Sequence, residues 1–352
     1  MKFILSGGGT MGSVSPLIAI CEEIKKRDAS AEFLWLATKN GPEERLIDSY
    51  HITVKKIHAG KLRRYWSGRN FIDPIFILLG FVQSFLIMRR FRPDWVLTAG
   101  GFVAVPVVWA ARWLGVPSFV HQQDVIAGLA NKLMARSAKI VTVTFKKSLA
   151  DFAAKNPVWT GNPVRPEILS GNAGDGYAYF GFKHFLPTIL IIGGGTGARG
   201  LNTLVAQSLE RLVQFCQVIH LTGGKVKLDF SHAHYRQFDF LTDQLKNAYA
   251  ISDLVVSRAG MQVLSELALL KKPTLVIPLP QSHQEANANE FFRQNAVAWL
   301  DETKTPPEIF VQAVSELLSD SAVRTSLSHN IGKIMPPDSA VKIVNQIYES
   351  AA

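Results

Sequence analysis

The chain has 352 residues, of which 47% are hydrophobic and 19% charged, and this composition excludes a disordered, collagen-like or coiled-coil protein. The length predicts two domains. Two cysteines, Cys21 and Cys216, are too few for a disulfide framework or a four-ligand zinc site, so we expect buried thiols and no metal. The first apolar stretch, residues 3–5, is too short for a signal peptide, which predicts a cytoplasmic protein.

The net charge of +10 is unevenly distributed along the chain. Residues 1–160 hold 22 lysines and arginines against 11 acidic residues, whereas residues 161–352 hold 16 against 17. A basic half of this kind faces an anionic partner, which could be nucleic acid, a lipid surface or a phosphorylated substrate.

Short apolar strands alternate with helical segments along both halves. In the first half we expect helices at 16–26 and 105–114 and strands at 2–6, 32–37, 94–98, 118–121 and 140–144. The pattern resets near residues 157–166, and further strands are expected at 188–192, 217–221, 254–257 and 274–278. Continuous apolar strands alternating with helices indicate parallel sheets covered by helices on both faces.

We therefore predict an α/β protein with two Rossmann-like domains, 1–163 and 164–352, that face each other across a cleft. The last helix, at about 338–352, can pack back on the first domain. Ligands of such sheets bind at the carboxyl ends of the strands.

Residues 71–88 form the most apolar stretch, which Asp73, Pro74 and Gln83 interrupt. Basic residues flank it on both sides: Lys55, Lys56, Lys61, Arg63, Arg64 and Arg69 before it, and Arg89, Arg90 and Arg92 after it. One interpretation is a buried helix of the first domain. The other is a helix that partly enters a bilayer surface while its basic flanks contact lipid phosphates. Both can hold for one helix, and a complete transmembrane span is the least favoured interpretation.

Two glycine-rich segments, Gly7-x-Gly9-x-x-Gly12 and Gly195-x-Gly197-x-x-Gly200, match the fingerprint of dinucleotide-binding loops. The fingerprint also requires an acidic residue after the second strand, to bind the adenosine ribose. The sequence offers Ala37-Thr38-Lys39 and Leu221-Thr222-Gly223-Gly224 there, so an NAD-dependent oxidoreductase is only an alternative. The sequence contains no P-loop and no Asp-x-Asp pair, which leaves helix N-termini and Arg165 or Arg199 to neutralise a diphosphate.

Six segments, in the same order, resemble the MurG family of glycosyltransferases. They are residues 7–16, 98–102, 121–131, 161–165, 193–199 and 257–266, and the last is followed by His283, Gln284 and Asn287. That family transfers N-acetylglucosamine from UDP-GlcNAc to an undecaprenyl-pyrophosphoryl-MurNAc-pentapeptide lipid. The resemblance implies a GT-B fold, with the donor bound mainly by the second domain and the lipid acceptor by the first. It also implies a peripheral location at the cytoplasmic face of the bacterial membrane, against its anionic surface, with no cofactor and no nucleic acid as partner.

The resemblance further implies roles for individual residues. Glu266 would accept hydrogen bonds from the two uridine ribose hydroxyls, and Leu241 would lie against uracil. Residues 261–265 would open a helix whose amides face the diphosphate. The full set of expected substrate-binding residues is Thr10, Met11, Gly12, Asp124, Arg165, Gly195, Thr196, Leu241, Met261, Gln262, Val263, Leu264, Ser265, Glu266, His283, Gln284 and Asn287. Without the motifs, Glu266 would be interpreted as an exposed helix carboxylate, Arg165 as a surface charge of a linker and His283 as a solvated loop histidine.

Two positions depart from the family pattern. Ser13 stands where the family has a histidine, and serine supplies no titratable imidazole. Asp124 stands where the family has an asparagine. Both are candidate catalytic residues, and Asp124 is our candidate for the general base that takes the acceptor proton. The alternative is that Asp124 caps a helix beginning near Ile126.

Other functions remain open at this point. A related GT-B enzyme could use another polyprenyl or glycolipid acceptor. The loss of the histidine at Ser13 also fits a catalytically weakened UDP-sugar-binding protein.

Overall fold

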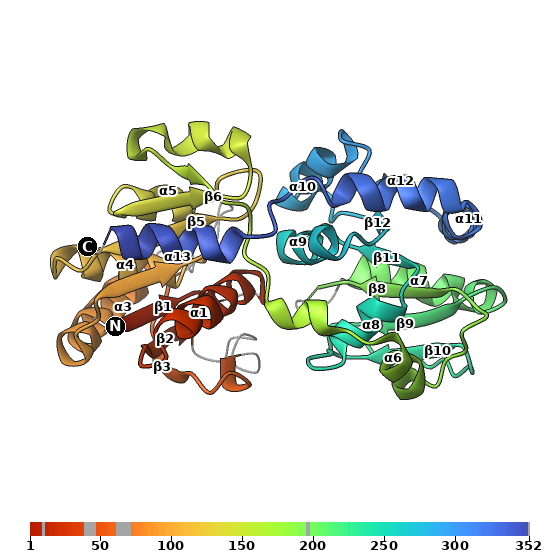
Figure 1. Ribbon diagram of the computed structural model, residues 1–352, viewed down its shortest axis with the longest axis horizontal. Coiled ribbons are helices and arrows are strands. Elements are labelled where there is room, and N and C mark those ends of the chain that lie inside the picture. The colour runs from red at the N-terminus through yellow and green to blue at the C-terminus, as the bar shows by residue number, and fades with distance from the viewer. Residues whose placement is uncertain (9–10, 39–46, 61–71, 195–197, 225, 351–352) are drawn as a thin grey trace. The chain divides into compact units, whose positions relative to one another are not determined.

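A computed structural model describes residues 1–8, 11–38, 47–60, 72–194, 198–224 and 226–350. The chain divides into two compact units (Figure 1). Unit 1 comprises Met1–Arg165 and Pro336–Ala352, and unit 2 comprises Pro166–Met335. The chain thus passes from unit 1 to unit 2 two residues after the expected boundary at 163, and its C-terminal segment is part of unit 1.

Unit 1 is built on a parallel sheet. Its strands are β1 (Lys2–Ser6), β2 (Glu32–Thr38), β3 (Thr53–Ile57), β4 (Trp95–Thr98), β5 (Ser118–Gln122), β6 (Ile140–Val143) and β7 (Val158–Trp159). Its helices are α1 (Ser15–Arg27), α3 (Asp73–Phe91), α4 (Ala104–Trp113), α5 (Leu129–Ala135) and α13 (Ser339–Glu349), with 3-10 segments η1 (Met11–Ser13) and η3 (Lys146–Lys155). The described strands lie in the order β3-β2-β1-β4-β5-β6-β7.

Alternate residues of the central strands of unit 1 enter two different cores. Phe3 and Leu5 of β1 pack with α1 and α13, whereas Ile4 packs with α3, α4 and α5 on the opposite face. The C-terminal helix α13 buries Ile343 and Ile347 in the first of these cores, and Figure 1 shows it lying across unit 1. Helices therefore cover both faces of this sheet, as continuous apolar strands require.

Unit 2 repeats this architecture. Its strands are β8 (Thr188–Ile192), β9 (Gln217–Leu221), β10 (Tyr235–Phe238), β11 (Leu254–Ser257), β12 (Thr274–Val276) and β13 (Ala298–Trp299). Its helices are η4 (Pro166–Ser170), α6 (Ala173–Phe180), α7 (Arg199–Leu212), α8 (Leu245–Ile251), α9 (Met261–Leu270), α10 (His283–Phe292), α11 (Pro307–Ser319) and α12 (Ser321–Ile331). The described strands form a parallel sheet in the order β10-β9-β8-β11-β12-β13. Two parallel α/β units confirm the predicted fold class.

Helix α3 packs on unit 1 through a buried stripe, and its half-buried Phe81 and Phe85 pack against the same core. Gly80, Ser84 and Met88 are buried and lie four residues apart, so they share one face of the helix. A side chain at Gly80 would overlap the carbonyl of His58, which explains the glycine. The residues that interrupt the apolar sequence are accommodated locally. Asp73 and Pro74 begin the helix, and the Gln83 side chain accepts a hydrogen bond of 2.8 Å from the His58 amide.

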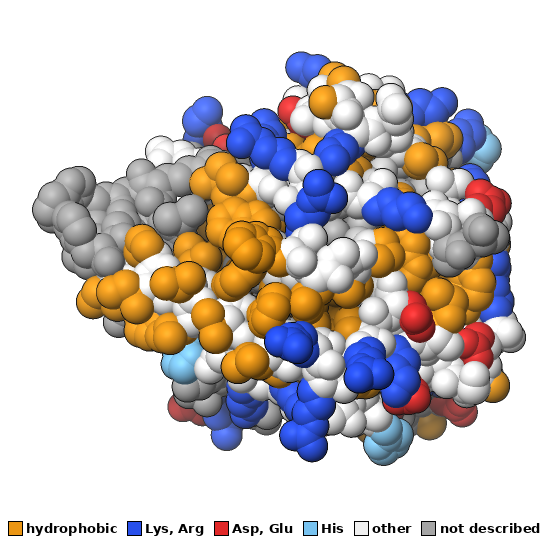
Figure 2. Space-filling view, turned by 90° about the vertical axis from the view of Figure 1, so that its left-hand side faces the viewer, with side chains coloured by type: hydrophobic (Ala, Val, Ile, Leu, Met, Phe, Trp, Pro, Cys, Tyr) orange, Lys and Arg blue, Asp and Glu red, His pale blue; other side chains and the backbone are white. Residues whose placement is uncertain are grey.

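Another side of α3 is exposed to the solvent. Its exposed apolar side chains are Ile75, Phe76, Leu78, Leu79, Val82 and Leu86. Figure 2 shows hydrophobic side chains gathered on this face of the molecule, with lysines and arginines at the margin. Among the described residues α3 is the one helix long and apolar enough to cross a membrane. Helix α3 is therefore only partly buried: one side packs against the core of unit 1, as the first interpretation expects, and the other side presents apolar side chains to the solvent.

Candidate active site

The turn between β11 and α9 lies at the carboxyl edge of the sheet of unit 2. Helix α9 begins at Met261, as predicted, and its N-cap residue Gly260 has an extended backbone with φ −64° and ψ 132°. Gly260 has no side chain to cap the first-turn amides. A helix N-terminus of this kind attracts anions because its N–H groups and dipole point outward.

Glu266 lies one turn further along α9 and is only 3% exposed. One carboxylate oxygen accepts a hydrogen bond of 2.9 Å from the Tyr249 hydroxyl, and the other accepts one of 3.1 Å from the Gln262 side chain. The alternative of an exposed helix carboxylate is therefore wrong. Each carboxylate oxygen can accept more than one hydrogen bond, so the held carboxylate can also serve as an acceptor for a diol.

Most other side chains of the 261–265 segment are buried in unit 2. Leu264 is fully buried, and the Ser265 hydroxyl donates to the Met261 carbonyl at 2.7 Å. Val263 is half-buried. A ligand at this helix would therefore meet backbone amides rather than these side chains.

Helix α10 follows β12, the neighbour of β11 in the sheet. Its first residue, His283, is exposed on the helix and does not lie in a loop. The Gln284 side chain accepts a hydrogen bond of 2.9 Å from the Leu279 amide and so holds the preceding loop. Asn287 is fully buried and donates to the Ala259 carbonyl at 3.4 Å, which links α10 to the turn before α9.

The loops after β8, β9 and β10 reach the same edge, because the strands are parallel and adjacent. Gly194 has φ +89°, which favours glycine, and Gly195 and Thr196 lie outside the described residues. Gly223 and Gly224 after β9 also have positive φ, and no carboxylate stands beside them in the sequence. Leu241 is half-buried in the loop between β10 and α8.

In unit 1 the adjacent strands β1, β4 and β5 end in loops at one edge. Thr10 and the side chain of Met11 lie outside the described part of the chain. The backbone of Met11, Gly12 and Ser13 forms the 3-10 segment η1. Ser13 is 6% exposed, and a side chain added at Gly7 or Gly101 would contact its hydroxyl. Ser13 is thus packed against the glycine turns that follow β1 and β4.

Asp124 follows β5 and is half-buried. The Gln122 side chain donates to the backbone carbonyls of Asp124 and Ile126 at 2.7 and 3.2 Å. The next helix, α5, begins only at Leu129 with Gly128 as its N-cap residue. The expected helix start near Ile126 was wrong, and with it the interpretation of Asp124 as a helix cap. Gln122 instead shapes this segment as an irregular turn.

Arg165 is the last residue of unit 1 and is only 6% exposed. Its guanidinium donates to the Tyr50 hydroxyl at 3.4 Å. The alternative of an exposed linker charge is therefore wrong. Arg199, the other candidate cation, is the first residue of α7 and is exposed.

Hydrogen-bonded networks of buried polar residues support the strand ends of both sheets, and the sequence alone did not predict them. His121 of β5 contacts Thr142 at 2.8 Å and Asn162 at 3.0 Å, and burial lowers the pKa of His121 to about 4 although the Asn162 hydrogen bond opposes the shift. Tyr249, which holds Glu266, lies 17 residues from it in sequence. No local pattern could reveal such pairs, because they form across the fold.

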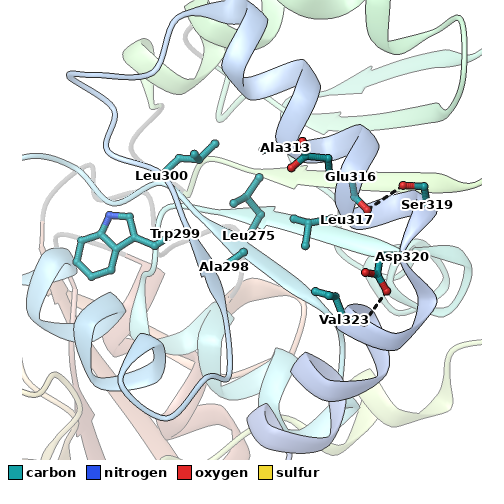
Figure 3. Close-up of a pocket in the computed structure, with 10 residues that line it drawn as sticks. All are labelled: Leu275, Ala298, Trp299, Leu300, Ala313, Glu316, Leu317, Ser319, Asp320 and Val323. Atoms are coloured by element: carbon teal, nitrogen blue, oxygen red, sulfur yellow. Dashed lines mark hydrogen bonds between the residues drawn. The ribbon is translucent and has the colours of Figure 1, made fainter.

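A pocket of about 500 Å³ in unit 2 lies elsewhere (Figure 3). Residues from β12, β13, α11 and α12 line it, among them Leu275, Trp299, Leu317 and Val323. None of its lining residues is an expected donor-site residue. We therefore place the candidate active site at the strand ends and not in this pocket.

Two parallel α/β units with glycine turns and helix N-termini at their strand ends are the architecture of the GT-B fold. The model of the glycosyltransferase family 28 N-terminal domain matches residues 3–143, and that of the family 28 C-terminal domain matches residues 188–341.

The chain is also similar to individual proteins over its whole length. It is 37% identical to UDP-N-acetylglucosamine–N-acetylmuramyl-(pentapeptide) pyrophosphoryl-undecaprenol N-acetylglucosamine transferase of Lachnospira eligens, covering 99% of both chains. It is 34% identical to the Clostridium kluyveri protein of the same name, covering 98% of both. The crystal structure of Acinetobacter baumannii MurG is 26% identical, with a TM-score of 0.71 over 99% of both chains. The chain belongs to glycosyltransferase family 28 and, within it, to the MurG family. This excludes the NAD-dependent alternative.

Proposed function

We propose that the protein transfers N-acetylglucosamine from UDP-GlcNAc to the lipid-linked MurNAc-pentapeptide precursor of peptidoglycan. The observation that carries this proposal is the similarity to relatives named for that reaction, at 34–37% identity over 98–99% of both chains. The candidate site supports it, because a helix N-terminus and a buried carboxylate stand together on α9.

The donor would bind to unit 2. The first-turn amides of α9 would face the diphosphate, and Glu266 would accept hydrogen bonds from the ribose hydroxyls. Leu241 would lie against uracil, and His283 and Gln284 would bind the sugar hydroxyls. Gly195 and Thr196 would contribute to the phosphate environment, and Arg165, the residue directly before unit 2, is the candidate guanidinium. No metal-binding cluster occurs among the described residues, and amide dipoles and guanidinium groups can bind a diphosphate without one.

The acceptor would react at the loops of unit 1. Its hydroxyl would attack the anomeric carbon of the sugar as UDP leaves, with inversion at that carbon. Asp124 would take the hydroxyl proton, since it is the carboxylate on the turn after β5. The negative charge that develops on the departing diphosphate would be stabilised by the first-turn amides of α9. Thr10, Met11, Gly12 and Ser13 would line the acceptor side.

We further propose that α3 docks on the anionic membrane surface that carries the acceptor, at its cytoplasmic face. The exposed apolar face of α3 is followed directly by Arg89, Arg90 and Arg92. Apolar side chains enter the headgroup boundary while basic ones contact lipid phosphates, which together give peripheral binding. Trp113, which is 78% exposed, packs edge-on against Phe81 of α3 and extends this surface with an aromatic side chain suited to the interface.

The proposal is tested with Glu266→Gln, which keeps the shape but removes the charge. We expect the wild type to transfer N-acetylglucosamine from UDP-GlcNAc to the MurNAc-pentapeptide lipid. In the variant we expect the donor KM to rise by roughly 100-fold, because two charge-assisted hydrogen bonds contribute about 1.5–3 kcal/mol each and are weakened rather than abolished. The acceptor KM should change little.

The matched control is Glu308→Gln, which affects an exposed carboxylate paired with Arg211 at 2.9 Å. We expect normal kinetics for this variant. A wild-type protein that transfers no sugar to this acceptor would contradict the proposed reaction. An unchanged donor KM in folded Glu266→Gln would contradict the assignment of the ribose site.

A further inference from the structure

The turn that precedes α9 contains a strained residue. Ala259 has φ +59°, a conformation that residues with a Cβ rarely adopt, and it is fully buried. Such a conformation persists only where surrounding contacts enforce it, and it is typical of functional sites. The orientation of the first-turn amides of α9 depends on this backbone conformation.

Polar contacts hold the strained turn from several sides. The Ser257 hydroxyl accepts a hydrogen bond of 3.3 Å from the Ala259 amide, and the Asn287 side chain donates to its carbonyl at 3.4 Å. Arg258, the preceding residue, is 3% exposed and forms two hydrogen bonds with the Glu302 carboxylate, at 2.5 and 2.8 Å. Arg258 also donates to the Ile277 carbonyl at 3.2 Å, which attaches the turn to the end of β12.

Glu302 also explains the last glycine of the second glycine-rich fingerprint. A side chain at Gly200, the second residue of α7, would overlap a Glu302 carboxylate oxygen. The close approach of the Glu302 carboxylate is thus sufficient to account for a glycine at position 200 without a bound phosphate. A carboxylate at the N-terminus of α7 is itself stabilised by the helix dipole. A carboxylate of the protein therefore already lies close to the N-terminus of α7, where the helix dipole is positive. The N-cap residue of α9, by contrast, is Gly260, which has no side chain to occupy the corresponding position.

We propose that Arg258 and Glu302 are positioning residues for the donor diphosphate. Glu302 occupies the N-terminus of α7, and through Arg258 it holds the strained turn so that the amides of α9 point toward the phosphates. The pair acts through the backbone and does not touch the substrate. This inference rests on the proposed donor site in unit 2.

The test is the double variant Arg258→Gln/Glu302→Gln, which removes both charges together and leaves no unpaired buried ion. Binding of UDP and of uridine is measured by calorimetry, together with the donor KM and kcat. We expect UDP to bind about tenfold more weakly, a loss of about 1.4 kcal/mol, while uridine affinity changes less than about twofold. Uridine lacks the diphosphate. The ratio of UDP affinity to uridine affinity therefore reports binding by the first-turn amides, because a smaller folded fraction would lower both affinities by the same factor.

Gly200→Ala keeps both charged groups but displaces the Glu302 carboxylate, and the same selective loss of UDP binding is expected. If the double variant does not fold, the ratio of UDP affinity to uridine affinity in Gly200→Ala tests the positioning role instead. Glu308→Gln again serves as control, since its ion pair with Arg211 of α7 is likewise within unit 2 but lies on the surface. Equal loss of UDP and uridine binding, or no loss in either variant, would overturn the positioning role. A wild-type protein that binds no UDP would instead contradict the proposed donor site.

Discussion

Side chains and turns at the candidate site are held in place by hydrogen bonds from other residues. Glu266 is fixed by Tyr249 and Gln262, and the segment that carries Asp124 is fixed by Gln122. The residue types and their motifs were legible in sequence, and their implied roles remain proposals. The Tyr249 partner was not legible, because it lies on another helix 17 residues away, whereas Gln262 stands one helical turn before Glu266 on the same helix.

The candidate general base gives the first prediction at this scale. Replacing Asp124 by asparagine preserves the shape of the side chain but removes its ability to take a proton. We expect kcat to fall by roughly 100-fold or more, within the range for loss of a general base. UDP binding should stay unchanged, since the donor would bind to unit 2.

Asp151→Asn is the control, because Asp151 is another carboxylate of unit 1 and pairs with Lys132 at 3.6 Å on the surface. Turnover near the wild-type value in a folded Asp124→Asn protein would eliminate Asp124 as the base.

The strands that are buried on both faces of a sheet were predicted, whereas exposed and very short strands were not. Strands such as β1, β8 and β11 read as continuous apolar runs because helices cover both sheet faces. The edge strand β3 was missed, since its sequence Thr-Val-Lys-Lys-Ile is mostly exposed, and β10 is an edge strand as well. Strands β7 and β13 have only two residues each and carry no periodic signal.

Helix α3 supplies the prediction at this scale. Leu78 and Leu86 are 63% and 60% exposed, so the double variant Leu78→Asn/Leu86→Asn should fold normally. We expect its binding to vesicles containing anionic lipid to fall at least about tenfold, because burying each leucine contributes roughly 1.5–3 kcal/mol. Co-sedimentation with vesicles measures this directly.

Leu169→Asn is the matched control, since Leu169 is a leucine of unit 2 with a similar exposure of 55%. If the α3 variant bound vesicles as well as the control, the docking surface would have to lie elsewhere.

At the scale of the whole molecule, each sheet contains one buried histidine. His121 lies in the sheet of unit 1 and His220 in that of unit 2, and burial lowers the pKa of each to about 4. In the unfolded chain both would titrate near pH 6.5. Between these values the unfolded state binds more protons, so the free energy of unfolding falls as the pH falls. Each neutral histidine therefore contributes stability that is complete above pH 6.5 and is lost toward pH 4.

We accordingly expect the urea midpoint of unfolding to fall between pH 7 and pH 5. The slope should be up to roughly 1.4 kcal/mol per pH unit for each histidine. Asp28 and Asp301 titrate below this range, because hydrogen bonds from the N-terminus and from Thr303 lower the pKa of their carboxyl groups. A midpoint that stays constant or rises on acidification would contradict this account.

The sequence by itself determined the α/β class, the two halves and the glycine turns at their strand ends. These follow from local periodicity and from backbone conformations that glycine alone adopts easily, so neighbouring residues suffice to specify them. Only the tertiary structure decided which face of α3 is exposed, that α13 belongs to unit 1, and that Glu302 reaches both Arg258 and Gly200. Such contacts join residues far apart in the chain, and packing rather than local sequence selects them.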